Sequence, residues 1–250
     1  ACFVFLLVYR LGKYGQITRD KMIAVTFFAF LTIFFWAIFE QAPGSLTTFA
    51  RDFTDRSLDG GAALTYKIIN SLMTLIPLGI ITWVLGLLFK QTFKKYSLAN
   101  IILGFSFVII WGVAIWMLYT EFQKGATEVP ASWFGVLNSL FIIGMAPLFS
   151  KWWESKYNPS ANGKFAIGMT LLGIGMACVA FGGSSIEAGA TTASVSMFWL
   201  VLVYFFHTMG ELCTSPVGLS YVSKLVPGKM IAFMFGIWYL AVAIGMKTAG

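Results

Sequence analysis

Long apolar runs separated by short polar linkers dominate the sequence. Seven runs are long enough to cross a bilayer, which requires about 20 mostly apolar residues. They cover residues 22–41, 68–89, 98–120, 132–150, 165–182, 196–222 and 229–247. An eighth run, 1–9, is too short to span, and we interpret it as the tail of a preceding helix. Because lipid offers no partners for free backbone N–H and C=O groups, the seven runs are predicted to be α-helices.

The charged residues of the linkers alternate in sign along the chain. Lys and Arg gather in the linkers 10–21, 90–97, 151–164 and 223–229, whereas the linkers between them carry most of the Asp and Glu residues. Loops on the cytoplasmic side of membranes are enriched in Lys and Arg, so these four linkers are predicted to face the cytoplasm. We therefore expect a multi-pass protein of the cytoplasmic (inner) membrane, surrounded by the lipid bilayer.

The composition excludes several other classes of protein. Of the residues, 58% are hydrophobic and only 11% are charged, whereas soluble domains carry roughly 25% charged residues. An ordinary soluble enzyme, a disordered chain and a secreted disulfide scaffold are excluded. Topology explains the net charge of +7, so no nucleic-acid partner is expected. Cys2, Cys178 and Cys213 lie in apolar runs, and we interpret them as buried thiols without disulfide or metal roles.

Two carboxylates in the predicted spans are informative, because a charged side chain inside a membrane usually faces a bundle interior or water. Glu40 follows Trp36 by four residues and shares its helix face, near the end of the span. It either reaches interfacial water or lies in a water-filled cavity, where it binds and releases a proton. Glu211 lies deeper in its span. It either pairs with a neighbouring helix or lines a pathway, and we favour the pathway.

A polar stripe is predicted around the deeper carboxylate, because His207, Glu211 and Ser215 are spaced by four residues. Pro216 removes an amide donor and is expected to kink the helix there. His207 is interpreted as a packed side chain or as a hydrogen-bonded modulator of Glu211. Catalytic zinc needs three protein ligands, so no metal site is expected. Since no nucleophile–base pair is visible either, the protein is not expected to be an enzyme.

Asn138 and Trp238 each allow two interpretations. A buried amide must find hydrogen-bond partners. Asn138 either bonds a neighbouring helix or donates to and accepts from a peptide-like ligand. Trp238, taken alone, is more typical of packing than of a binding site.

At four places the sequence resembles one family of transporters. Residues 34–41, Phe-Phe-Trp-Ala-Ile-Phe-Glu-Gln, resemble the Phe-Trp-x-x-Phe-Glu-Gln signature of the proton-dependent oligopeptide transporters. Residues 210–220 resemble the second signature of that family, 138–147 are similar to its eighth core helix, and 236–238 are similar to its eleventh. The four matches occur in the right order, which makes the resemblance specific.

The resemblance implies an all-α fold of the major facilitator superfamily, with twelve core helices in two six-helix halves. The chain would then be a fragment of the carboxy-terminal half, and the missing amino-terminal half would be its partner. Four segments follow: the tail of a helix at 1–9, a cytoplasmic linker with core helix seven and an outer loop at 10–56, an inserted helical pair at 57–130, and core helices eight to eleven at 131–250. The resemblance does not indicate a role for the inserted pair.

The resemblance also implies proton-coupled symport of di- and tripeptides, with protons as the coupling ion and no cofactor. Glu211 would attract the amino group of the peptide and, without peptide, pair with a lysine of the missing half. Glu40 would be the protonation site that couples proton entry to gating. Protonation would break an ion pair between the halves and bias which side is open. The other implied substrate-binding residues are Asn138, Trp36, Trp238 and Ser215.

Two alternatives to peptide symport remain. One is a related transporter of another small solute, such as nitrate or an amino-acid conjugate, although Glu211 favours a substrate with a positive amino group. The other is a non-transporting membrane scaffold or receptor, in which Glu40, Glu211 and Asn138 would be dispensable. His207 departs from the family, which usually has a small or apolar residue at this position.

Overall fold

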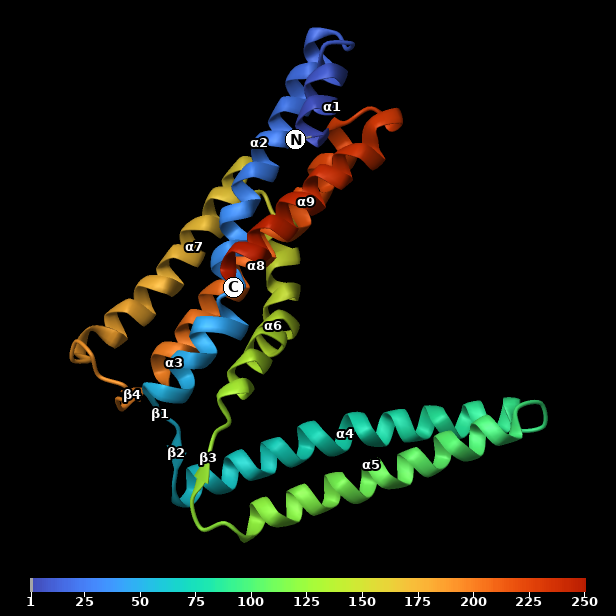
Figure 1. Cartoon of the computed structure of the whole chain (residues 1–250), viewed down its shortest axis with the longest axis vertical. Coiled ribbons are helices and arrows are strands. Elements are labelled where there is room, and N and C mark those ends of the chain that lie inside the picture. Colours follow the sequence, from blue (N-terminus) through green and yellow to red (C-terminus); the bar gives the residue numbers. More distant parts are fainter. Residues whose placement is uncertain (1) are drawn as a thin grey trace. The chain divides into compact units, whose positions relative to one another are not determined.

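The structure is a computed structural model that describes residues 2–250, apart from the side chains of Cys2, Phe3, Val4 and Arg10. The interpretation of Cys2 as a buried thiol lies outside the described side chains. The chain divides into two units (Figure 1): one extends to Arg56 and resumes at Pro130–Gly250, and the other is Ser57–Val129. In the described residues, seven helical segments are long and apolar enough to cross a membrane, as the hydropathy pattern predicts.

The first unit is a bundle of helices, which we call the bundle. Its helices and strands are α1 (Cys2–Leu11), α2 (Gln16–Phe39), α3 (Thr47–Asp52), β1 (Thr54–Asp55), α6 (Phe134–Glu154), α7 (Ala161–Gly182), β4 (Val195–Ser196), α8 (Phe198–Leu225) and α9 (Ile231–Ala249). A π-helical turn covers Ala42–Leu46, and 3-10 turns cover Ala131–Trp133, Gly183–Ser185 and Gly228–Met230. The main packing pairs are α7 with α8, α2 with α9, and α6 with α8.

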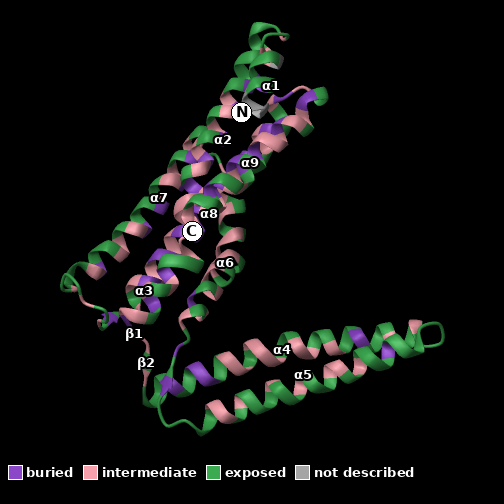
Figure 2. Cartoon of the chain, viewed as in Figure 1, coloured by how far each residue is buried: buried purple, intermediate pink, exposed green. Residues whose placement is uncertain are grey.

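Helix α8 packs against α7, α6, α2 and α9 and carries more buried residues than any other described helix (Figure 2). Three glycines of α7, Gly168, Gly175 and Gly182, are spaced by seven residues and lie against it. A Cβ at these positions would overlap the side chains of Thr214, His207 and Trp199, respectively. Small residues let membrane helices approach closely, so this row of glycines explains why α7 and α8 pack tightly together.

Helices α2 and α9 approach one another in the same way. A Cβ on Gly245 of α9 would lie 2.6 Å from the Ile33 carbonyl oxygen and 2.8 Å from Trp36 Cβ. Near the ends of both helices the Gln41 side-chain amide donates to the Ala249 carbonyl at 3.1 Å. The pair therefore holds Trp36 and the end of α2 in a defined position.

The outer segment after α2 differs from the loop that the sequence predicts over 42–67. The chain stays helical through the π-turn and α3 to Asp52, and the next helix already begins at Gly60. Pro43 stands at the start of the π-turn, where its missing N–H is tolerated. Gly44 adopts a kinked, non-helical backbone there. Helix α2 therefore ends at Phe39, and the turn residues bend the chain into a further helical segment.

The linkers at the two ends of the bundle are arranged as the alternation of basic and acidic linkers predicts. At the end that holds the acidic linkers, β1 pairs in parallel with β4, with Thr54 opposite Val195. At the opposite end, the Tyr221 hydroxyl of α8 donates to the Asn162 side chain of α7 at 2.8 Å. Linkers of the same charge type therefore lie at the same end of the bundle.

The second unit is a helical hairpin, formed by β2 (Ser57–Leu58), α4 (Gly60–Thr92), α5 (Ser97–Gln123) and β3 (Thr127–Glu128). The short strands β2 and β3 are antiparallel and close its base. Polar contacts join the two helices: Trp111 Nε1 donates to Thr82 Oγ1 at 2.9 Å, and Asn100 Nδ2 donates to Thr92 Oγ1 at 3.1 Å. That this hairpin is an insertion into a core of other helices stays a prediction.

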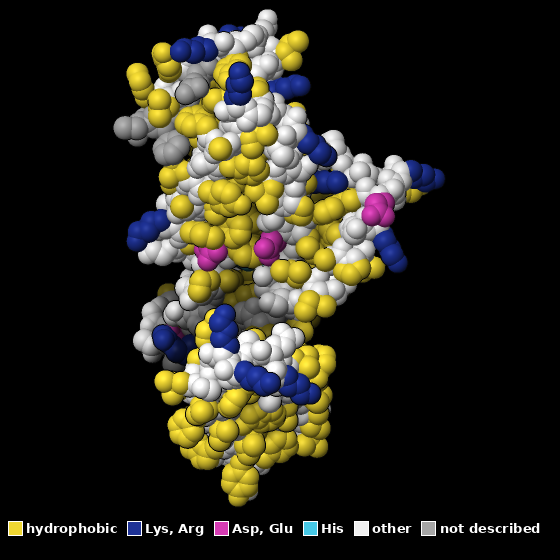
Figure 3. Space-filling view, turned by 90° about the vertical axis from the view of Figure 1, so that its right-hand side faces the viewer, with side chains coloured by type: hydrophobic (Ala, Val, Ile, Leu, Met, Phe, Trp, Pro, Cys, Tyr) yellow, Lys and Arg dark blue, Asp and Glu magenta, His cyan; other side chains and the backbone are white. Residues whose placement is uncertain are grey.

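Apolar side chains cover large parts of the molecular surface in Figure 3, and Lys and Arg side chains lie in small groups between them. Exposed Ile, Leu, Val, Phe and Trp side chains are especially frequent on α4 and α5. A soluble protein rarely exposes contiguous apolar patches of this extent. The surface therefore fits helices that are surrounded by lipid.

Candidate functional site

A chain of polar side chains links α6 to α8 inside the bundle. The Asn138 amide nitrogen donates to Glu211 Oε2 at 3.4 Å. The Thr208 hydroxyl lies 2.5 Å from Asn138 Oδ1 and 2.7 Å from the Tyr204 carbonyl oxygen, and its one hydrogen can serve one acceptor at a time. When Thr208 donates to Asn138, the amide is oriented with its N–H groups toward the carboxylate. Asn138 and Glu211 are thus brought together by the fold.

The Glu211 carboxylate retains free acceptor capacity. An ionised carboxylate has about four lone-pair sites, and Asn138 occupies one of them. Among the described residues, no Lys, Arg or His side chain lies within 4.0 Å of Glu211 or Glu40. Each of these carboxylates can therefore accept a positively charged donor or a proton.

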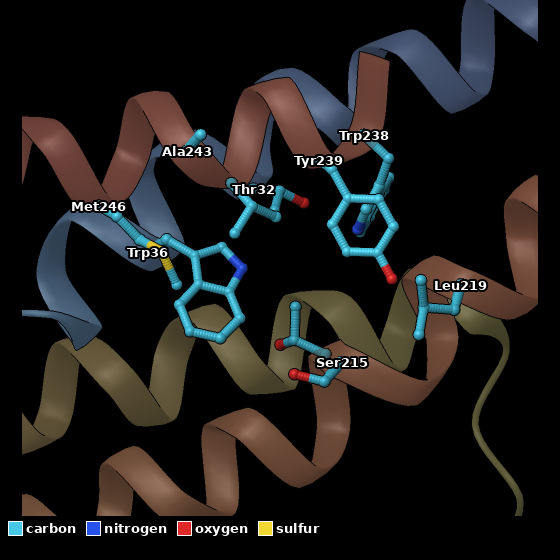
Figure 4. A pocket seen from close by; sticks show the side chains of 10 residues that line it. Thr32, Trp36, Ser215, Leu219, Trp238, Tyr239, Ala243 and Met246 are labelled. Atoms are coloured by element: carbon cyan, nitrogen blue, oxygen red, sulfur yellow. The ribbon is translucent and has the colours of Figure 1, made fainter. Parts of the chain in front are cut away.

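A pocket of about 440 Å³ lies between α2, α8 and α9 (Figure 4). Three of the predicted substrate-binding residues, Trp36, Ser215 and Trp238, line it together. In Figure 4, Trp36 and Tyr239 project from α2 and α9 toward the segment of α8 that carries Ser215 and Leu219. The remaining lining residues are Thr32, Thr214, Val242, Ala243 and Met246. Ser215 follows Glu211 by about one helical turn on α8, but Glu211, Asn138 and Glu40 do not themselves line this pocket.

The two tryptophans of the pocket differ in how they are held. Trp238 is only 5% exposed, and its ring packs against Gly218, where any Cβ would overlap it. It therefore serves both packing and the pocket wall. Trp36 is half-buried and makes edge contacts with Phe35 and Phe39, at centroid distances of 5.8 and 5.4 Å. Aromatic neighbours thus orient both indoles without closing the pocket.

The predicted polar stripe on α8 does not form a single surface. A helix turns by about 40° beyond a full turn in every four residues, so His207 and Ser215 lie about 80° apart. Ser215 lines the pocket, whereas His207 is buried against Gly175 of α7 and stacks on Phe39 of α2 at a centroid distance of 6.0 Å. His207 Nε2 has no hydrogen-bond partner in the described part of the chain. The structure thus places His207 in the packing between three helices.

Glu40 lies at the end of α2 and is half-buried. Its backbone N–H donates to the Trp36 carbonyl at 3.0 Å, as expected at a helix end. The next residue, Gln41, was not singled out by the sequence analysis, yet it anchors this end: it donates to Ala249 and accepts from the Ser45 hydroxyl at 2.5 Å. Glu40 is therefore carried on a fixed turn beside the interior of the bundle.

Sequence reasoning also missed Thr208, Thr32 and Tyr239. Thr208 lies three residues before Glu211 on an otherwise apolar helix, and this spacing was a usable signal. Thr32 and Tyr239 enter only because helices distant in sequence meet at the pocket. No group of three or more His, Cys, Asp or Glu side chains that could hold a metal ion occurs among the described residues.

A bundle of apolar helices with polar side chains in its interior defines a class, the multi-pass helical membrane proteins. Within this class, the model of the POT family matches residues 113–250. The chain belongs to the POT family.

Two curated relatives are similar to the chain. The peptide transporter YePEPT of Yersinia enterocolitica is 26% identical over 250 residues, which cover 98% of this chain and 36% of the relative. Dipeptide and tripeptide permease B of Aliivibrio fischeri is 28% identical over 201 residues, which cover 72% of this chain and 40% of the relative. The chain thus spans well under half the length of either protein.

Solved structures show the same fold. A POT family transporter crystallised in complex with a thioalcohol-conjugated peptide matches 99% of this chain and 38% of its own length, with a TM-score of 0.59 and 21% identity. The fold is that of the major facilitator superfamily, as the resemblance predicts, and the chain covers a part of it. It is a segment of a multi-pass protein of the cytoplasmic membrane.

Proposed function

We propose that the protein to which this chain belongs is a proton-coupled symporter of di- and tripeptides that works by alternating access. The observation that carries the proposal is the Glu211 carboxylate, which Asn138 orients and which no cation of the described residues neutralises. The curated relatives that are named peptide transporters and permeases support this choice of substrate.

The geometry suits a small zwitterion. The ammonium group of a peptide would donate to Glu211 through a charge-assisted hydrogen bond, which is stronger than a neutral one. Asn138 is held close enough to bond the peptide backbone as well. The pocket walls contributed by Trp36, Trp238 and Tyr239 are aromatic, so they accept apolar side chains without selecting one shape. The volume of about 440 Å³ falls within the range of small-molecule sites.

Proton coupling would use Glu40, which lies at the end of α2 and forms no ion pair with another described residue. Glu211 would bind the peptide amino group, and Glu40 would bind and release the proton. The other half of the protein would supply basic partners for these carboxylates, and protonation would release one such ion pair between the halves. No cofactor is required, because the proton is the coupling ion.

The test is uptake of labelled dialanine by the full-length protein in liposomes. We expect accumulation only with an inward proton gradient. Glu40→Gln should abolish gradient-driven accumulation while exchange of labelled for unlabelled dialanine continues, because the peptide site stays intact. Glu187→Gln, on an exposed loop residue, is the matched control and should behave like the wild type.

Three results would reject parts of the proposal. Uptake that ignores the gradient would reject symport. Gradient-driven uptake of labelled nitrate that unlabelled dialanine does not reduce would favour a transporter of another solute. A folded protein that neither binds nor exchanges any peptide would favour a scaffold.

A further inference from the structure

A second pocket, of about 390 Å³, lies where the α6–α7 linker meets the end of α8. It shares no lining residue with the pocket that holds Trp36. Its polar lining comprises Asn158, Lys164, Ser220, Tyr221 and Lys224, and its apolar lining includes the ring of Trp153. We call it the basic pocket. The proposed transport mechanism makes no use of these residues.

The charge of the basic pocket is positive and uncompensated. Lys164 comes from the first turn of α7 and Lys224 from the last turn of α8, so two elements converge to place two ammonium groups around one cavity. No Asp or Glu lines the pocket. In the described part of the chain, neither lysine forms an ion pair. Lys164 Nζ lies 4.5 Å from the centre of the Trp153 ring, which orients it.

Neutral donors add to this positive field. The Ser220 hydroxyl makes no hydrogen bond to another described residue. Ala161, the first residue of the 22-residue helix α7, also lines the pocket. Its backbone N–H is one of those that a helix leaves unpaired at its start, where the helix dipole favours an anion. Lysines, a hydroxyl and a helix start together form the donor set of a phosphate site.

The position of the basic pocket favours the phosphate of a lipid over inorganic phosphate. It lies at the end of the bundle where the Lys- and Arg-rich linkers gather, which is the predicted cytoplasmic side. Trp153 and Tyr221 are residue types enriched at the bilayer interface. Pro159, Pro216 and Val217 give the cavity an apolar wall. An inorganic phosphate would leave this wall uncovered, whereas the first carbons of a lipid chain would cover it.

We propose that the basic pocket binds the headgroup phosphate of an anionic phospholipid of the cytoplasmic leaflet. Lys164 and Lys224 hold the phosphate from two sides, and Ser220 donates a hydrogen bond to it. The glycerol and the upper acyl chains lie on the apolar wall beside Pro216. Because the lipid joins the start of α7 to the end of α8, it stabilises the end of the bundle at which these helices meet.

The test is a titration of the full-length protein, purified in an uncharged detergent, with phosphatidylglycerol, and native mass spectrometry counts the bound lipid. Replacing both lysines (Lys164→Gln and Lys224→Gln) should lower the affinity for the first phosphatidylglycerol about 30-fold, since each lysine near a lipid surface contributes several-fold. The matched control replaces Lys90 and Lys94 with Gln. Both are exposed and lie in another basic linker, so affinity should stay within about twofold of the wild type.

Further measurements distinguish a lipid phosphate from free phosphate. A conservative double variant shows whether a loss of binding comes from misfolding. Phosphatidylcholine should bind the wild type far more weakly than phosphatidylglycerol, and Lys164→Arg with Lys224→Arg should retain the preference. Equal loss in both glutamine variants would overturn the proposal, because it would indicate nonspecific attraction. Competition by millimolar inorganic phosphate would assign the pocket to the free ion instead. If the other half of the protein covers the pocket, the wild type will show no preference for phosphatidylglycerol. That result would also overturn the proposal. None of these readouts depends on peptide transport.

Discussion

Helix α8 of the bundle and the two helices of the hairpin differ in hydropathy and in burial. Helices α4 and α5 of the hairpin have mean hydropathies of 2.2 and 2.5, and only 6% of either span is buried. Helix α8 of the bundle has the lowest mean hydropathy of the seven described spans, 1.2, and the largest buried share, 56%. The least apolar described helix is thus the most enclosed one, and it is the helix that carries Glu211.

The polar groups of the two units also differ in whether their neighbours satisfy all of their hydrogen bonds. In the hairpin, Trp111 and Thr82 bond one another and so pin two helices together. In the bundle, Thr208 and Asn138 lead to a carboxylate that still has free acceptor sites. A polar group that is fully satisfied by its neighbours contributes to packing. One with remaining acceptor capacity inside a bundle is available to a partner or a ligand.

The largest structural effect is expected where the bundle is tightest. Gly168→Val should destabilise the protein by about 1–3 kcal/mol or more, because the added atoms meet Thr214 and the Gly210 carbonyl. Thermal melting in detergent measures the loss. Gly173→Val, on the same helix with nothing within 4 Å of its Cβ position, is the control. A similar loss in both variants would show that α7 does not depend on this contact.

A moderate effect is expected at the polar chain of the bundle. Asn138→Ala removes the donor that orients Glu211, so the affinity for dialanine should fall roughly tenfold, as for a hydrogen bond to a charged group. Ser139→Ala changes the exposed neighbouring residue and should leave affinity unchanged. Equilibrium binding of labelled dialanine reports both. If the two variants bind equally well, Asn138 acts only in helix packing.

A small effect is expected in the hairpin. Trp111→Phe removes the hydrogen bond to Thr82, and hydrogen bonds between membrane helices contribute about 0.6 kcal/mol on average. Trp116→Phe alters a side chain that is 65% exposed and serves as the control. Melting temperatures should fall by a degree or two for the first variant and not for the second. A large loss in the first would mean that this bond organises more than the hairpin.

The smallest effect on function is expected from removing the hairpin altogether. Ser57 pairs with Glu128, so its two ends are neighbours, and a short Gly-Ser linker can join Arg56 to Pro130. All candidate site residues lie in the bundle. Affinity for dialanine should therefore stay within about twofold, the usual scatter for changes remote from a site. A folded variant that has lost peptide binding would assign the hairpin to the site.

The sequence was sufficient to predict the helices and to single out candidate residues, because both depend on local patterns; the roles of these residues stay predictions. Apolar runs predict spans, and the carboxylates at 40 and 211 stand out against them. Packing between distant helices was not predictable. Gly175 and His207 are neighbours only because α7 lies on α8. The helical segment after α2 was missed, since Pro43 and Gly44 lie in a π-turn that leads into α3.

The central claim is that Glu211 is an open carboxylate that recognises the amino group of a peptide. Equilibrium binding of labelled dialanine to Glu211→Gln, with Glu187→Gln as the reference, tests it most directly. The affinity of the first variant should fall about 10- to 100-fold, the range for hydrogen bonds to charged groups, and that of the second should equal the wild type. Equal affinities of both folded variants would contradict the claim.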